Sequence, residues 1–586
     1  MSAPLRRESS YVKSPASSKP PQQNTKKIVV IVLLGFLGIF GILVIFSIFK
    51  FKTQKVKLPP LLQDPYIQVY MNHSQADDYI EPYRKISRFG DDLEKLIVEA
   101  LASANFSVDV AIQELRLPRI AAALVARHKA GVKVRVILEN NYSTPWSEIN
   151  ENKLGKLTER ERDRYAEYRR LADANGDNKL TPEEIKQGDA LVMLRDAGIP
   201  VIDDTADGSK GSGLMHHKFV IIDGKRLIIT SANFTSSDLH GDFKFSESRG
   251  NANNLLKIES SELAAIFAEE FALMWGDGVG GKQDSKFGIK KPFRGARQVR
   301  IGSGIITVQF SPTEKKVLWE ESTNGAIAKT LNKATQSIDM ALFVFSEQRI
   351  VNTLERLHQR GVKLRALIEP SFAYRSYSEA LDMMGVTLFE NCKYEANNKP
   401  WQNPISTVGV PNLPAGDFLH HKFAVVDRQI VLTGSHNWSV AANNNNDETL
   451  LVIENPTVAA HFLREFERLY AGAQLGITAS LQAKIKERQE QCRNSSISRN
   501  LLSEDAINKS STKIQNSTLK PQHKVLVNLN TATLEEIEAL PGVGSKLAQR
   551  IVEARQQKPF ASLEDLQQVP GVGPKLLEKL RDRVTW

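Results

Sequence analysis

SVDVAIQELRLPRIAAALVARHKAGVKVRVILE, residues 107–139, aligns without a gap with SIDMALFVFSEQRIVNTLERLHQRGVKLRALIE, residues 337–369. Each copy begins with an apolar stretch, continues through a helical stretch that ends at a glycine, and closes with a second apolar stretch. This is the pattern of a β-α-β unit, in which a helix joins two parallel strands. The repeat therefore predicts an α/β fold with two pseudo-symmetric halves, which we place at 58–278 and 300–475.

The composition is that of an ordinary globular protein. The chain has 586 residues, of which 41% are hydrophobic and 25% charged, so it is neither fibrous nor disordered as a whole and is long enough for about three or four domains. Two cysteines, Cys392 and Cys492, exclude a disulfide framework and a cysteine-built zinc site. The net charge of +10 is concentrated near the two ends. This favours lipid headgroups at one end and nucleic acid at the other, with solubility alone as the alternative.

The N-terminal region has two segments. Residues 1–27 are rich in Ser, Pro, Gln and Lys, which is typical of a disordered basic arm. Residues 28–49 contain no charge over 22 positions, and a helix of this length spans about 33 Å, enough to cross a bilayer. A signal peptide would have a shorter apolar region that ends in small residues, so we expect an uncleaved single-pass membrane helix. Four lysines on each side leave its orientation open.

A second duplicated pattern follows in each half. HHKFVIID (216–223) precedes TSAN (230–233), and HHKFAVVD (420–427) precedes GSHN (434–437). On a strand, the His and Lys of each HxK face the same side. Two lysines, with Ser and Asn as further donors, can hold the oxygens of a phosphodiester while one imidazole attacks phosphorus and the other protonates the leaving oxygen. A single HxK would be better explained by a buried structural histidine, but the duplication favours catalysis. The candidate catalytic residues are His216, Lys218, Asp223, Ser231, Asn233, His420, Lys422, Asp427, Ser435, Asn437 and Glu448.

These motifs resemble the signature of the phospholipase D superfamily, with Thr230 in place of one glycine. The resemblance implies two α/β halves that share one active site, a phosphohistidine intermediate, and chemistry that needs no metal. Members act on lipids or on nucleic acids, so the substrate stays open. Members often carry a carboxylate after the motif to orient a histidine. Glu448 fits that position in the second half, but the aligned residue in the first half is Asn253. We therefore expect inequivalent histidines and favour His216 as the nucleophile, without settling the assignment.

The first half carries an insertion at about 150–190. Within it, DANGDNKLTPEE (173–184) resembles an EF-hand calcium loop. Asn178 replaces the usual glycine and no second loop is evident, so we expect weak, structural or regulatory Ca²⁺ binding that takes no part in the chemistry. A solvated acidic turn between two helices is the alternative. The implied ligands are the side chains of Asp173, Asn175, Asp177, Thr181 and Glu184 and the backbone carbonyl of Lys179.

The C-terminal segment contains a shorter repeat. LPGVGSKL (540–547) returns as VPGVGPKL (569–576), and residues 476–522 before it are expected to form a helix and a flexible linker. Residues 523–586 resemble a tandem helix-hairpin-helix domain, similar to the soluble domain of membrane-anchored competence DNA receptors. The resemblance implies DNA binding without sequence preference, through backbone amides at helix N-termini; a hairpin that serves packing alone is the alternative. The implied DNA-binding residues are Gly542, Gly544, Lys546, Gly571, Gly573 and Lys575.

Together these features predict a membrane-anchored phosphodiesterase with a monomeric catalytic core on the outer face of the membrane. We favour a nuclease that hydrolyses DNA. A phospholipase D that hydrolyses membrane phospholipids would leave the DNA-binding segment unexplained. A DNA-binding receptor with a vestigial core is a further alternative, against which the intact His, Lys and Asp of both motifs argue.

Overall fold

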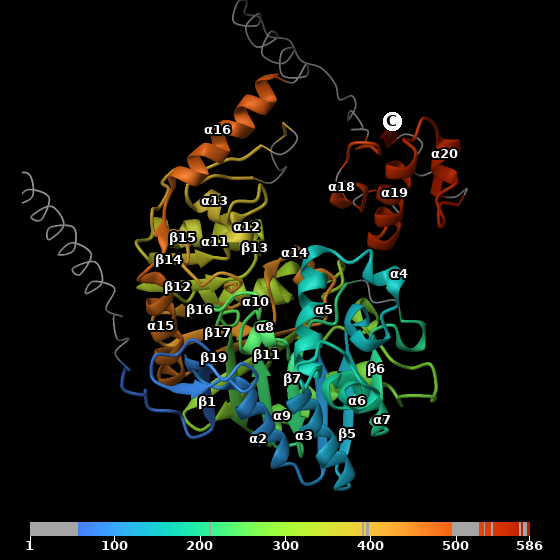
Figure 1. Ribbon diagram of the computed structural model, residues 1–586. Helices are drawn as coiled ribbons and strands as arrows, with labels where there is room; N and C mark the ends of the chain where they lie inside the picture. The colour runs from blue at the N-terminus through green and yellow to red at the C-terminus, as the bar shows by residue number, and fades with distance from the viewer. Residues whose placement is uncertain are drawn as a thin grey trace, which may run out of the picture. The chain divides into compact units, whose positions relative to one another are not determined.

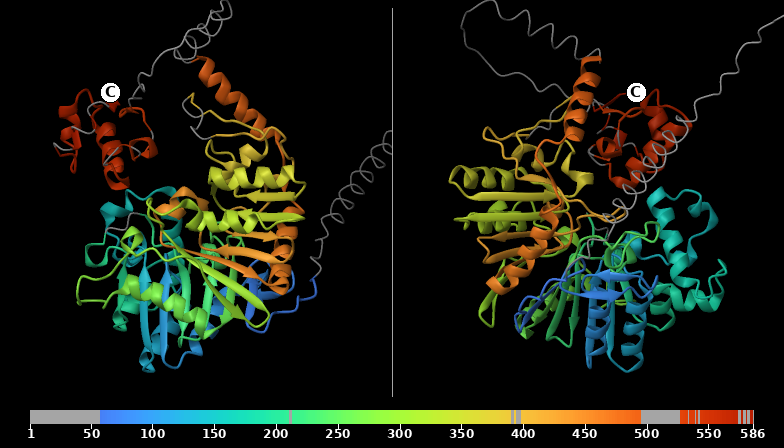
Figure 2. Two further views of the ribbon diagram at one scale, coloured as in Figure 1. Left: turned by 180° about the vertical axis from the view of Figure 1, so that it is seen from behind. Right: turned by 60° about the vertical axis from the view of Figure 1, so that its left-hand side comes forward.

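The computed structural model describes residues 57–209, 213–389, 392–393, 398–494 and 527–585, the last range without 533, 539, 541–542, 574–575, 578–579 and 581–582. The chain divides into two compact units, Met1–Arg499 and Asn500–Trp586 (Figures 1 and 2). The predicted basic arm, the predicted membrane helix at 28–49 and most of the predicted linker lie outside the described residues. Within the described ranges, no helix combines the length and apolarity needed to cross a membrane.

The first half is built on a seven-stranded mixed sheet with the order β1-β9-β8-β7-β4-β5-β6. β4 and β5 are parallel, as the repeat predicts, and are joined by α3 (Pro118–Lys129). β7 runs antiparallel to both β4 and β8, so the strand that begins at Lys218 lies in the middle of the sheet. The strands are β1 (Ile67–Met71), β4 (Ser107–Ile112), β5 (Lys133–Leu138), β6 (Val201–Asp203), β7 (Lys218–Ile222), β8 (Arg226–Thr230) and β9 (Asn254–Glu259).

The second half repeats this plan in a nine-stranded mixed sheet with the order β10-β11-β19-β17-β16-β12-β14-β15-β20. β12 and β14 are its parallel pair, joined by α11 (Gln348–Gln359), and β16 is the equivalent of β7. The strands are β10 (Arg297–Ile301), β11 (Gly304–Ser311), β12 (Ser337–Leu342), β14 (Lys363–Ile368), β15 (Val408–Val410), β16 (Lys422–Val426), β17 (Ile430–Gly434), β19 (Glu448–Glu454) and β20 (Gln474–Leu475).

The two halves share one hydrophobic core. Phe219 and Phe267 of the first half belong to the same buried cluster as Phe423 and Phe462 of the second. The outer face of each sheet has its own cluster (Figure 1). In the first half it is covered by α3, α2 (Leu93–Ala102) and α7 (Ala190–Asp196), and in the second by α11, α10 (Thr323–Leu331) and α13 (Glu379–Met383). Both sheets are therefore buried on both faces, which explains why β7 and β16 are continuous apolar runs rather than alternating ones.

Shorter elements complete the catalytic unit. Two small sheets pair β2 (Asp78–Ile80) with β3 (Ser87–Phe89), and β13 (Phe345–Ser346) with β18 (Trp438–Ser439). The other helices are α2 (Leu93–Ala102), α4 (Glu151–Leu154), α5 (Glu159–Ala172), α6 (Pro182–Gly188), α7 (Ala190–Asp196), α8 (Ser236–Leu239), α9 (Ser261–Trp275), α10 (Thr323–Leu331), α12 (Pro370–Ala373), α13 (Glu379–Met383), α14 (Val440–Asn444), α15 (Pro456–Tyr470) and α16 (Ala479–Asn494).

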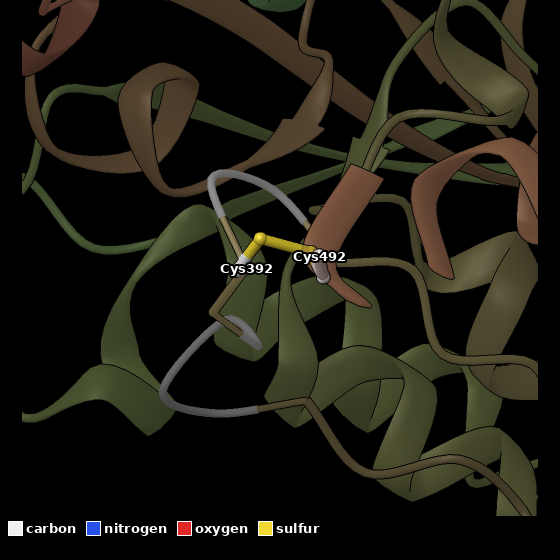
Figure 3. The surroundings of a disulfide bond; sticks show 2 residues. All are labelled: Cys392 and Cys492. Atoms are coloured by element: carbon white, nitrogen blue, oxygen red, sulfur yellow. A yellow bond between two sulfur atoms is a disulfide. The ribbon is translucent and has the colours of Figure 1, made fainter. Parts of the chain in front are cut away.

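Cys392 and Cys492 form a disulfide across a sequence separation of 100 residues (Figure 3). Cys492 is on α16, whereas Cys392 follows α13 in the second half. The bond therefore ties the last helix of the catalytic unit to that half. Sequence analysis correctly excluded a framework of several disulfides but did not predict this single one.

The C-terminal unit has a core of its own. Leu529, Ile537, Ile551 and Leu566 are buried in it. We predicted an all-α unit; the structure adds a short parallel pair, β21 (Val527–Asn528) with β22 (Val584–Thr585), which joins the two ends of the unit. The helices are α18 (Leu534–Glu538), α19 (Ser545–Gln557) and α20 (Leu563–Gln567).

Candidate active site

His216 is held by a carboxylate from the other half of the molecule. It lies directly before β7, and its Nδ1 is 2.7 Å from Oε2 of Glu448, the first residue of β19. Ser435 donates its hydroxyl to the same oxygen at 2.6 Å, and Asn446 donates to Oε1 at 3.2 Å. Glu448 is fully buried. This arrangement fixes the ring with its Nδ1–H toward the carboxylate and leaves Nε2 as the reactive nitrogen.

His420 is held in the reverse sense by the first half. Its Nδ1 is 3.0 Å from Oδ1 of Asn253, and Ser231 donates to the same oxygen at 2.7 Å. Asn253 and Glu448 thus occupy equivalent places, as their alignment indicated. The backbone repeats this exchange: the amide of His216 donates to Asp447 O, and that of His420 donates to Ala252 O. Each half therefore orients the histidine of the other, one with a carboxylate and one with an amide.

The two lysines of the motifs are buried beside the histidines. Lys218 donates to the carbonyl of His216 at 2.9 Å and to Oε1 of Gln113 at 3.2 Å. Lys422 donates to the carbonyl of His420 at 2.7 Å, and its Nζ lies 4.8 Å from the centre of the Phe343 ring. Burial lowers the pKa of Lys218 to about 8 and that of Lys422 well below its usual value.

The two histidines and the two lysines interact electrostatically. Burial, helped by Lys218 and Lys422 and opposed by Glu448, lowers the pKa of His216 to about 4. Burial also lowers the pKa of His420 well below its usual value, and Lys422, Lys218 and His216 act in the same direction. Without substrate both imidazoles therefore favour the unprotonated form, which His216 needs if it is to act as a nucleophile. A bound phosphodiester anion would raise both pKa values.

The Ser and Asn residues of the motifs have different surroundings. Ser231 and Ser435, predicted as donors to phosphate, instead orient Asn253 and Glu448. The Oδ1 atoms of Asn233 and Asn437 are buried and have no hydrogen-bond partner among the described residues. An amide oxygen only accepts hydrogen bonds, whereas phosphate oxygens need donors, so the role of the two asparagines as donors to phosphate stays a prediction.

The aspartates of both motifs lie away from the histidines, which corrects their predicted catalytic role. Asp223 follows the far end of β7, where its carboxylate accepts hydrogen bonds from the backbone amides of residues 105–107. Asp427 does the same for the amides of residues 335–337. These bonds lower the pKa of both carboxyls despite partial burial. The two aspartates fix the turn after β7 or β16 to the start of the neighbouring β4 or β12.

The second histidine of each HHK was missed as a site residue. His217 bridges Thr449 Oγ1 at 2.8 Å and Glu270 at 3.0 Å. His421 bridges Asn254 at 3.1 Å and Glu465 at 3.0 Å. Both rings are fully buried. His217 links α9 of its own half to β19 of the other half, and His421 links α15 to β9 in the same way. The sequence signal that could have identified them is the second histidine that both motifs share, directly after the first.

The predicted calcium loop forms a compact turn between α5 and α6. Asp173 accepts from the amides of Gly176 at 2.7 Å and Asn178 at 2.8 Å, and Asn178 has a φ of 63°. Glu184 accepts from the hydroxyl and amide of Thr181 and so caps α6. In the described part of the chain, no three His, Cys, Asp or Glu side chains are grouped to hold a metal ion. The calcium site stays a prediction.

The insertion that carries this loop also lines a cavity together with both halves of the catalytic unit. A cavity of about 440 Å³ lies between α5 and segments that include Ser237, Asn251 and Phe418. Phe418 lies two residues before His420, and the guanidinium of Arg160 lies 5.9 Å from the centre of its ring. The cavity is lined by Thr158, Glu159, Arg160, Asp163, Arg164, Glu167, Ser237, Asp242, Phe245, Asn251, Gly416 and Phe418.

The predicted DNA-binding glycines are described in part. α19 begins directly after Gly544, and Gly573 accepts the first hydrogen bonds of a further helical turn from the amides of Leu576 and Leu577. Gly571 has a φ of 103°, which favours glycine. Gly542, Lys575 and the Lys546 side chain lie outside the described residues. Both described turns fit the hairpin geometry that the repeat predicts.

Similarity to known proteins covers both units. A family model described as cardiolipin synthase, PLD-like domain, matches residues 97–275 and 327–470, and a helix-hairpin-helix motif model matches 522–585. Mitochondrial cardiolipin hydrolase of Mus musculus is 30% identical over 152 residues, which are 26% of this chain and 59% of that protein. Its Homo sapiens counterpart is 31% identical over 152 residues, 26% of this chain and 52% of that protein. The chain thus spans between half and three fifths of these relatives.

Two of the solved structures that the comparison matches are bacterial proteins. The phospholipase D family member Nuc from Salmonella typhimurium has a TM-score of 0.23 and 22% identity, and the match covers 30% of this chain and 98% of that one. Phosphatidylserine synthase from Haemophilus influenzae has a TM-score of 0.44 and 12% identity, with 76% and 94% covered. Because the family model covers more than half of the 586 residues and spans both halves of the catalytic unit, the chain belongs to the family of cardiolipin synthase, PLD-like domains.

Proposed function

We propose that the chain hydrolyses DNA through a covalent phosphohistidine on His216. The observation that carries this proposal is the crossed pair of histidines: Glu448 of the second half holds His216, and Asn253 of the first half holds His420. The two motif lysines are buried beside them. Two histidines from one chain complete the site, so we also propose a monomeric catalytic core.

Each group of the site has one task in this reaction. Lys218 and Lys422 hold the non-bridging oxygens of the phosphodiester and offset the charge that develops on them. The bound phosphodiester anion raises the pKa of His420, which takes up a proton from solvent. Nε2 of His216 then attacks phosphorus while His420 donates that proton to the leaving oxygen, so that one P–N bond forms as one P–O bond breaks. His420 then takes a proton from water, which attacks phosphorus and releases His216. Glu448 stabilises the positive charge that the phosphorylated ring carries.

DNA is favoured as the substrate because a helix-hairpin-helix segment is part of the same chain. Such turns bind phosphates through backbone amides and read no base sequence. A phospholipid is the second candidate: the two mammalian relatives are named as cardiolipin hydrolases, and the apolar stretch at 28–49 would hold the enzyme at a membrane. We further propose an extracytoplasmic location, which the disulfide between Cys392 and Cys492 supports because disulfides persist in oxidising compartments.

The test is a substrate panel with the full chain in detergent micelles: plasmid DNA, single-stranded DNA, cardiolipin and phosphatidylcholine, each with and without EDTA. We expect turnover of DNA. His216→Ala and His420→Ala should each lower it at least about a thousandfold, which is the loss of nucleophilic or acid–base catalysis, while leaving DNA affinity within about twofold. Hydrolysis of cardiolipin without cleavage of either DNA would replace the proposal by the lipid alternative.

Removal of residues 523–586 tests the recruiting role of the C-terminal unit. DNA affinity should fall, and the difference from the full chain should shrink as salt rises, because phosphate contacts release counterions. The rate on a small nitrophenyl phosphodiester should stay unchanged. An equal loss on both substrates would show that the segment supports folding of the catalytic unit instead.

A further inference from the structure

His420 has a carboxylate close by that comes from an unexpected element. Asp238 on α8 is 3% exposed, and its Oδ1 lies 3.7 Å from Nδ1 of His420. The equivalent residue in the second half is Ala442 on α14, since each follows the HxK histidine of its own half by the same number of positions. The first half has Asn253 where the second half has the carboxylate of Glu448. It has a carboxylate nearby instead, that of Asp238 on α8.

The surroundings of Asn253 explain why the carboxylate is displaced. The Nδ2 of Asn253 donates to the carbonyls of Asp238 and Asn251, both at 3.1 Å, while its Oδ1 accepts from Ser231 and His420. A carboxylate at this position would place an oxygen against two carbonyl oxygens in a buried site, which is strongly unfavourable. An amide is needed there, so the negative charge has to come from elsewhere.

Asn253 also connects the two groups. Its Nδ2 lies 3.5 Å from Oδ1 of Asp238 while its Oδ1 faces Nδ1 of His420. Asp238 is fixed by the amide of Asn233 at 2.8 Å and by the Nδ2 of Asn251 at 2.5 Å. The carboxylate is thus held rigidly beside the histidine and is joined to it by one amide.

We infer that Asp238 is the positioning residue of His420: it orients the ring through Asn253 and stabilises the imidazolium that must form when His420 acts as acid or base. The inference rests on the proposed function, in which His420 exchanges protons with the leaving oxygen and with water.

The charges that face His420 make such a partner necessary. Lys422, Lys218, His216 and His421 all oppose its protonation, in addition to burial. The same carboxylate raises the pKa of both lysines and so helps to keep them charged. Without Asp238, no carboxylate would stabilise the protonated form of His420 against these positive charges.

Asp238→Asn in the full chain tests this inference. An opposite charge within about 4–6 Å shifts a pKa by about 1–3 units, so the pKa of His420, followed by nitrogen NMR on ¹⁵N-histidine-labelled protein, should fall by at least about one unit, whereas that of His216 should shift less. On a nitrophenyl phosphodiester, kcat should fall at least about tenfold with KM within about twofold. Asp196→Asn, the same change on the exposed surface of α7, should alter neither quantity.

Asp238→Ala gives a second, independent measurement. Alanine is the natural residue at this place in α14, so the short helix tolerates it, and formate should restore at least about tenfold of the lost kcat without affecting the wild-type rate. An unchanged His420 pKa in Asp238→Asn, or no rescue of Asp238→Ala, would overturn the inference. If the wild-type chain turned over no phosphodiester, the proposed function would fail, and the titration of His420 would still decide the role of Asp238.

Discussion

Glu448→Gln removes the negative charge beside His216 and leaves the size of the side chain unchanged. Glu448 is fully buried, and its Oε2 lies 2.7 Å from Nδ1 of His216. A unit charge pair at this distance interacts by about 6 kcal/mol at an effective dielectric constant of about 20. A hydrogen bond to a charged group contributes about 1.5–3 kcal/mol net. The covalent step, in which the ring becomes cationic, should therefore lose about 2–4 kcal/mol, and kcat should fall about 30- to 1,000-fold.

The assay is steady-state hydrolysis of a nitrophenyl phosphodiester, with Glu454→Gln as the matched control. Glu454 is the last residue of the same strand and pairs with Lys333 at the surface, so its loss should change kcat less than about twofold, as surface ion pairs contribute little. Phosphoenzyme trapped by rapid acid quench should be reduced in Glu448→Gln. A kcat within threefold of wild type would show that Glu448 does not support the nucleophile.

The pH profile provides a second test of the same change. Burial holds the pKa of His216 near 4 although Glu448 raises it. The nucleophilic form is therefore present above pH 4 and is lost as the pH falls through that value. Glu448→Gln removes the group that favours the cation, so the acid limb of kcat/KM should move to lower pH. A shift of this limb to higher pH would contradict the assignment of His216 as the nucleophile.

Three further predictions concern the rest of the catalytic unit. Asp427→Asn should lower the free energy of unfolding by about 1–3 kcal/mol through lost backbone hydrogen bonds, while kcat per folded molecule stays within about twofold. Denaturant titration measures the stability, and counting of active sites corrects kcat for unfolded protein. A large loss of kcat would restore a catalytic role for Asp427. Cys492→Ser should lower the stability of the full chain by about 2–5 kcal/mol, and reductant should do the same to wild type but not to the variant; equal melting temperatures would mean that the bond does not form in solution. Calorimetric titration should detect weak Ca²⁺ binding that is absent in the Asp173→Ala, Glu184→Ala double variant, and identical traces would exclude the calcium site.

The duplicated segments were sufficient to predict two α/β halves and to single out the two His-Lys pairs that the structure buries at the ends of β7 and β16. The β-α-β pattern and the two HxK strands can be recognised in short stretches of sequence, because a strand that is buried on both faces needs a continuous apolar run. The role of Asp223 was wrong for a reason that strand geometry could have supplied. It stands five positions beyond Lys218, and a strand of that length carries it about 16 Å away, to the opposite end of β7.

Other features left no trace in the sequence. The disulfide joins positions 100 residues apart, and nothing in the surrounding residues indicates that the chain brings them together. Asp238 lies in a short helix whose sequence has no catalytic signature, and its importance depends on a contact made across the two halves. Contacts of this kind depend on tertiary packing, which a single sequence does not reveal.

The crossed support of the two histidines has an evolutionary consequence. In a homodimer with the same arrangement, every substitution would occur on both sides of the two-fold axis at once, and both histidines would have to keep identical partners. Joining the two copies in one chain removes this constraint, because each partner is then encoded separately. Glu448 in one half and Asn253 with Asp238 in the other are a difference that a symmetric pair could not have acquired. Fusion of this kind lets one histidine specialise in forming the covalent bond while the other specialises in moving protons.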